Sequence, residues 1–76
     1  MVSGKKLVKL LNQLGYITIR QHKSHITLRK VISAGEHNIT IPNHNEIAKG
    51  TLNDILKKVS IWNNISKDEL IIMLKI

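Results

Sequence analysis

The feature that most constrains the fold of this chain is a change in the spacing of its apolar residues. At the start, leucines recur with the spacing of one helical face, namely Leu7, Leu10, Leu11 and Leu14. Beyond them, apolar residues alternate with polar ones over residues 16–21, 25–31 and 37–42. That spacing of two is typical of strands with one buried face. The sequence therefore predicts one helix followed by three short strands.

The residues around these segments predict how they begin, end and connect. Ser3 is placed to cap the first helix, and Gly15 is placed to end it. The links between the strands, residues 21–24 and 33–35, are short, which favours antiparallel hairpins. Pro42 ends the third strand, because it lacks the N–H that strand pairing needs.

The rest of the chain predicts two more helices. Thr51 and Asp54 match a capping box at the start of a second helix, and residues 60–65 are expected to break that helix. A short third helix is expected to start at Ser66. Its residues 70–74 are apolar all round, so they are either deeply buried or covered by a partner.

The expected architecture is a single α+β domain over residues 1–76, in the order α-β-β-β-α with an added C-terminal helix. Its sheet is expected to bury an isoleucine face, which includes Ile17 and Ile19, under the two main helices and to leave the other face open. Strand alternation places five polar or basic residues on that open face, namely Thr18, Arg20, His25, Thr27 and Arg29.

The positive charge of the chain is concentrated in its first half. Residues 1–35 contain seven basic residues and no acidic one, which accounts for the net charge of +7. A one-sided basic surface is the usual footprint of a polyanion partner, with nucleic acid ahead of a membrane. Aromatic residues make up only 3% of the chain, which argues against a protein that reads single strands by stacking their bases.

Several classes of protein are disfavoured by what the sequence lacks. It contains no cysteine, so disulfides and cysteine-based zinc sites are excluded, and no Asp or Glu falls in a recognised ligand spacing. It has no phosphate-loop or dinucleotide motif. Its longest apolar run, residues 70–74, is far too short to span a bilayer, and no secretory signal is present. We therefore expect a cytoplasmic protein with no metal, no cofactor and no membrane partner.

Cleavage of RNA without a metal is a reaction within reach of a small basic protein. The RNA supplies its own nucleophile, the 2′-hydroxyl, so the protein needs a histidine as general acid or base and cations to hold the phosphate. His25 is the first candidate, because it starts a strand on the open face among basic residues; the alternative is a surface histidine without function. His44, in the loop after the proline, is a secondary candidate. His22 is expected in the hairpin loop, and His37 beside the core isoleucines.

Segments spread along the chain resemble, in order and spacing, the HicA family of toxin endoribonucleases. They are Ser3-Gly4-Lys5, Leu14-Gly15-Tyr16, the run Arg20-Gln21-His22-Lys23-Ser24-His25, the run Ile41-Pro42-Asn43-His44, and Lys49-Gly50-Thr51-Leu52 with Ile55-Leu56-Lys57. The resemblance covers residues 3–59 and leaves residues 60–76 as a C-terminal helical extension. Lys23 stands where the family motif has glycine, and Ile26 stands where a second histidine is common.

The resemblance implies a double-stranded-RNA-binding-like fold, cleavage of messenger RNA without a metal, and inhibition by a HicB-type antitoxin. The family's catalytic histidine corresponds to His25, which would act as general acid or base. The residues expected to bind RNA are Arg20, Lys23, Ser24, Arg29, Lys30, Lys5, Lys6 and Lys9.

Two other functions stay open. One is a non-catalytic module of the same fold that binds duplex RNA by its backbone and shape. The other is a protein-interaction subunit that uses the C-terminal helix and Trp62. In a toxin, that same surface would meet the antitoxin or, by self-association, a second copy of the chain.

Overall fold

Six elements follow one another in the computed structural model, which describes residues 2–75. In chain order they are α1 (Gly4–Gln13), β1 (Ile17–His22), β2 (His25–Ile32), β3 (Gly35–Pro42), α2 (Lys49–Asn63) and α3 (Lys67–Lys75). The strands form one antiparallel sheet in the order β1-β2-β3. The predicted α+β architecture, α-β-β-β-α with an added C-terminal helix, is confirmed.

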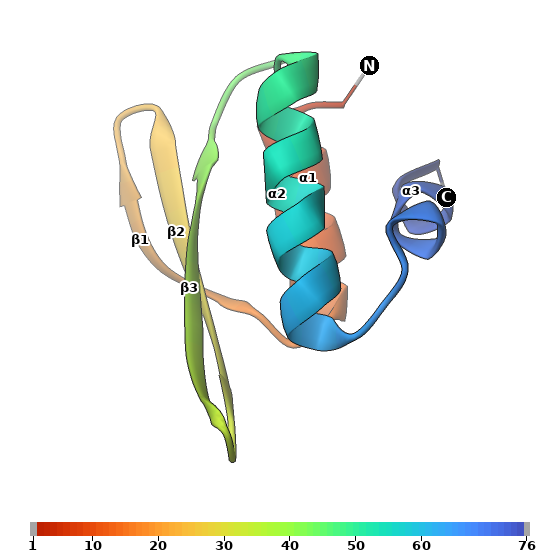
Figure 1. Cartoon of the computed structure of the whole chain (residues 1–76). Helices are drawn as coiled ribbons and strands as arrows, with labels where there is room; N and C mark the ends of the chain where they lie inside the picture. Colours follow the sequence, from red (N-terminus) through yellow and green to blue (C-terminus); the bar gives the residue numbers. More distant parts are fainter. Residues whose placement is uncertain (1, 76) are drawn as a thin grey trace.

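The helices lie on one face of the sheet. Both α1 and α2 cover that face, and α3 packs against α1 and α2 (Figure 1). The interior between them is filled by leucine, isoleucine and valine side chains together with one tyrosine. The most deeply buried are Leu7, Leu11, Tyr16, Leu28, Ile41, Leu56, Val59 and Leu70. Within residues 2–75, the opposite face of the sheet carries no helix.

Both ends of α1 follow the sequence prediction. The Oγ of Ser3 accepts a hydrogen bond from the backbone N of Lys6 at 3.1 Å, which satisfies one of the free N–H groups of the first turn. Gly15 has a φ of 99° just beyond the last turn, a conformation that favours glycine. At Gly4 a methyl group would overlap the carbonyl oxygen of Pro42. The missing side chain therefore lets α1 begin directly against the end of β3.

The predicted faces of β1 are wrong in its first half. Ile17 is 63% exposed and Ile19 is 41% exposed, whereas Tyr16 is buried. The strand has an irregularity between Thr18 and Arg20, because Thr18 lies opposite Leu28 while Arg20 lies opposite Thr27. One extra residue in β1 exchanges the two faces at that point. The open face therefore gains Ile17 and loses Thr18, but it keeps Arg20.

The predicted start of α2 is also wrong. The helix begins after Ala48, which makes no side-chain cap, so Thr51 lies inside the helix instead of capping it. The break predicted within residues 60–65 is confirmed, because the helix ends at Asn63 and Asn64 takes a left-handed conformation. Tertiary contacts hold this last turn: Asn63 Nδ2 donates a hydrogen bond to the hydroxyl of Tyr16 at 3.0 Å, and Trp62 stacks on His37. These contacts involve residues far away in sequence, which local spacing does not reveal.

The start of α3 is confirmed. The Oγ of Ser66 accepts a hydrogen bond from the backbone N of Glu69 at 3.1 Å. Leu70 and Leu74 are buried against the other helices, whereas Ile72 is 60% exposed. The apolar segment therefore divides into a buried stripe and one exposed isoleucine.

Candidate active site

The turn between β1 and β2 places two histidines side by side. Only Lys23 and Ser24 separate the strands, and His22 lies directly opposite His25 in the ladder. Directly opposed residues of antiparallel strands point to the same face of a sheet. His25 precedes buried Ile26, so both histidines lie on the open face, and both are exposed. The predicted position of His25 is confirmed, while His22 belongs to the strand and not to the loop.

A row of polar side chains follows the histidines along the open face. Arg20 lies opposite Thr27, and Thr27 lies opposite Thr40 on β3. The two threonine Oγ1 atoms are 3.4 Å apart. Arg20 is therefore placed on the face that carries His22 and His25, two pairs further along the ladder.

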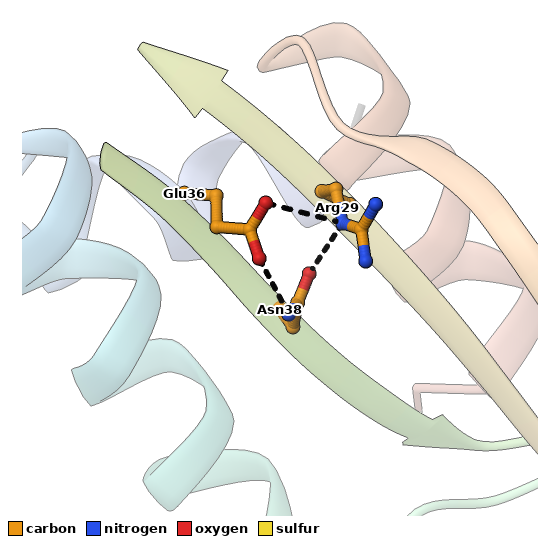
Figure 2. A network of polar contacts seen from close by, with 3 residues as sticks. All are labelled: Arg29, Glu36 and Asn38. Carbon is orange, nitrogen blue, oxygen red and sulfur yellow. Dashed lines mark hydrogen bonds and ion pairs between the residues drawn. The ribbon is translucent and has the colours of Figure 1, made fainter. Parts of the chain in front are cut away.

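Arg29 extends the same face and already has two polar neighbours. Its Nε donates a hydrogen bond to Oδ1 of Asn38 at 2.9 Å and lies 3.6 Å from Oε2 of Glu36. Both contacts use Nε, and the terminal guanidinium nitrogens point away from Asn38 and Glu36 (Figure 2). This half-exposed ion pair contributes little to stability. Neither contact occupies the two terminal guanidinium nitrogens of Arg29.

Three segments meet at the end of the molecule that carries the hairpin turn. The backbone N of Asn43 donates a hydrogen bond to the carbonyl oxygen of Ser24 at 2.6 Å. The backbone N of Gly4 donates a hydrogen bond to the carbonyl oxygen of His44 at 2.9 Å. The turn, the loop after β3 and the start of α1 are therefore tied together. This arrangement brings Ser24 and exposed His44 to the same end as His25, together with exposed Lys5 at the start of α1.

Not all of the basic residues expected to bind RNA lie on this face. Lys30 points toward the helices, where its Nζ donates a hydrogen bond to Oδ1 of Asn63 at 2.6 Å and lies 5.8 Å from the centre of the Tyr16 ring. Lys6 and Lys9 line a pocket between α1 and α3, together with Leu10, Gln13, Met73 and Leu74. Because Lys30 directly follows Arg29 in β2, strand alternation by itself places Lys30 on the opposite face of the sheet, toward the helices.

A second histidine site lies under the helices. The hydroxyl of Tyr16 and Nδ1 of His37 are 2.6 Å apart, and the His37 ring stacks on Trp62 with a centroid separation of 5.1 Å. Burial lowers the pKa of His37, and the positive charge of Lys58 lowers it further. Burial raises the pKa of Tyr16, an effect that the hydrogen bond from Asn63 opposes. His37 is therefore a packed side chain at the edge of the core, as the sequence predicts.

Residues 2–75 contain neither a metal-binding cluster nor a membrane-spanning helix. No three His, Asp or Glu side chains in this part of the chain gather closely enough to hold a metal ion. None of its helices is both long enough and apolar enough to cross a membrane.

Comparison with protein families gives one finding. Residues 4–61 match the family described as the HicA toxin of bacterial toxin–antitoxin systems. The matched segment includes the whole sheet, both histidines of the hairpin and most of α2, whereas α3 lies outside it. No curated protein and no solved structure matches the chain.

Proposed function

Because the chain belongs to the HicA family of toxins from bacterial toxin–antitoxin systems, we propose that it is an endoribonuclease that cleaves messenger RNA. The observation that carries the proposal is exposed His25, held on a strand of the open sheet face with Arg20 and Arg29 on the same face. A side chain placed by paired strands has a defined position relative to its neighbours. The proposed substrate places the activity in the cytoplasm.

The proposed reaction needs few protein groups. The 2′-hydroxyl of the RNA attacks the adjacent phosphorus, the bond to the 5′-oxygen breaks, and a 2′,3′-cyclic phosphate and a 5′-hydroxyl result. His25 takes the proton from the 2′-hydroxyl or gives one to the 5′-oxygen, because imidazole does both near neutral pH. No metal or other cofactor is assigned a step.

The cations of the site neutralise the charge that grows on the phosphate oxygens. Arg20, Arg29 and Lys23 are assigned to the scissile phosphate, and Ser24 is assigned to the adjacent backbone. Lys5, Lys6 and Lys9 on α1 are proposed to bind RNA further from the cut. His44 stays a secondary candidate at the same end of the molecule. We leave Lys30 out of this surface, since its ammonium group bonds to Asn63 under the helices.

The proposal is tested with purified protein and RNA in EDTA. We expect wild-type protein to cut RNA to products with 2′,3′-cyclic phosphate ends, and His25→Ala to lose cleavage by about 10²-fold or more. Circular dichroism should show an unchanged fold in the variant. A fully active His25→Ala protein would contradict the assignment of His25. Intact RNA with salt-sensitive binding would instead support the non-catalytic duplex-RNA-binding module.

A toxin of this family has an antitoxin partner, and we propose that it is a HicB-type protein. The support is the family match. Co-expression of the chain with the product of an adjacent reading frame should relieve growth arrest and yield a stable complex on purification. Growth arrest that no neighbouring gene relieves would contradict the proposed partner.

A further inference from the structure

We propose that His22 is a second catalytic residue, and that His22 and His25 act as an acid–base pair on one phosphate. The proposal rests on the endoribonuclease function proposed above and goes beyond it. The family motif assigns a role only to the position of His25. What points to His22 is its place in this sheet, directly opposite His25 across the hairpin.

The spacing of the pair follows from strand geometry. Opposed residues in antiparallel strands have Cα atoms about 4.5–5.5 Å apart and Cβ atoms at a similar separation, on the same face. His22 and His25 enclose a link of only two residues, so the strands cannot diverge between them. The backbone bond from Asn43 to Ser24 also ties this turn to the loop after β3. The two imidazoles are thus neighbours on a supported turn, and both are open to solvent.

The surroundings of the pair suit a phosphodiester. Lys23 lies between the two histidines in sequence, and Arg20 shares their face. The other two histidines are placed differently: His37 is packed between Tyr16 and Trp62, and His44 lies in the loop after β3. Across the described residues 2–75, His22 and His25 are the two histidines paired across strands.

The pair accounts for both proton transfers of the reaction. One neutral imidazole takes the proton of the 2′-hydroxyl as that oxygen bonds to phosphorus. The other, as imidazolium, gives a proton to the 5′-oxygen as its bond to phosphorus breaks. One proton enters the pair and one leaves it, so the pair keeps its total charge, and exchange with water restores the starting forms. With a single histidine, either one imidazole would have to serve both oxygens, or solvent would have to accept the proton of the 2′-hydroxyl or supply the proton of the 5′-oxygen.

The first experiment compares His22→Ala and His25→Ala with Gln21→Ala. Gln21 is an exposed neighbour on the same strand but lies opposite buried Ile26, so it faces the other way. A mixed-sequence transcript first locates a cleavage site for the wild-type protein. Single-turnover rates are then measured against pH on an oligonucleotide with one ribonucleotide at that site. We expect a bell-shaped profile for wild type and Gln21→Ala, and a loss of about 10²-fold or more with one limb missing for His22→Ala.

The second experiment separates proton transfer from positioning. A substrate whose 5′-oxygen is replaced by sulfur has a leaving group that needs no acid. We expect one of the two alanine variants to recover most of its lost rate on this substrate, because that variant lacks the general acid. Rescue of neither variant would mean that the histidines do not divide the roles, and would overturn the proposal. His22→Gln is measured in the same way. If His22→Ala unfolds, this variant replaces it, because glutamine keeps a polar side chain at the position.

The outcomes distinguish this inference from the function on which it rests. If wild type and Gln21→Ala cleave RNA and His22→Ala cleaves within about threefold of them, His22 is not catalytic and the nuclease function stands. If wild type cuts no RNA while the protein is folded, both the nuclease function and the pair are wrong.

Discussion

Lys23 is the residue of the site whose backbone conformation is least favourable. Its φ of 52° lies in the left-handed region, which costs a residue with a side chain about 1–2 kcal/mol. The family motif has glycine at this position, where no such cost arises. Lys23 therefore places a positive charge next to the two histidines, and its backbone conformation lowers the stability of the fold.

This strain is measurable with two variants that both remove the charge. We expect Lys23→Gly to be more stable to urea unfolding than Lys23→Ala by about 1 kcal/mol, because only glycine adopts the turn freely. Their cleavage rates should fall together, since both lose the ammonium group. Equal unfolding free energies would mean that the turn stores no strain at this residue.

His37 should make stability depend on pH. Burial and the charge of Lys58 lower its pKa in the folded state below the ordinary value of 6.5. Above that value the imidazole is neutral in both states, and the full stabilisation is present. As pH falls below 6.5, the unfolded chain binds a proton before the folded one does, so stability is lost until the pH passes the folded pKa.

Urea unfolding between pH 5 and pH 8 tests this effect. The free energy of unfolding of wild type should rise with pH across the lower part of this range, and His37→Gln should show a flatter dependence. Lys58→Ala should make this rise smaller, because removing the positive charge brings the folded pKa of His37 closer to its unfolded value. Parallel curves for wild type and His37→Gln would contradict the assignment.

At the scale of elements, the junction of α1 with β3 positions the loop that carries His44. Gly4 touches the carbonyl of Pro42, and a methyl group there meets backbone that cannot move aside. We expect Gly4→Ala to lower the free energy of unfolding by about 1–3 kcal/mol. Gly50→Ala is the matched control, because a methyl group in α2 meets open space and should stabilise by up to about 1 kcal/mol. If both variants unfolded alike, close packing at Gly4 would be disproved.

The strands differ in how far local spacing predicts them. In β2 and β3, alternation places Ile26, Leu28, Ile39 and Ile41 in the core as expected. In β1 the same rule fails at Ile17, because the irregularity between Thr18 and Arg20 depends on how β1 pairs with β2. A bulge in an edge strand leaves no mark in the polar and apolar pattern.

At the scale of the whole molecule, the basic side chains from the first half of the sequence lie on more than one surface. Arg20, Lys23 and Arg29 lie at or beside the histidine face, whereas Lys6 and Lys9 border the pocket beside α3, and Lys30 faces α2. The net charge alone does not show this division. RNA contacts are therefore expected to centre on the hairpin and the open face.

Self-association through the C-terminal helix stays a prediction. Within the chain, α3 buries Leu70 and Leu74 and exposes Ile72, so one isoleucine is available to a second copy. Sedimentation velocity over a range of concentrations should show association that Ile72→Glu abolishes. A single mass for wild type at every concentration would contradict self-association.

The sequence by itself determined the kind and order of the elements, the buried residues of β2 and β3, the caps at Ser3 and Ser66, and the place of His25. These features follow from spacing and capping, which act between residues close along the chain. Only the tertiary structure decided which side of β1 is exposed, which contacts hold the last turn of α2, and that His22 lies opposite His25. Those outcomes depend on the register between strands and on contacts between residues distant in sequence, which only the folded chain brings together.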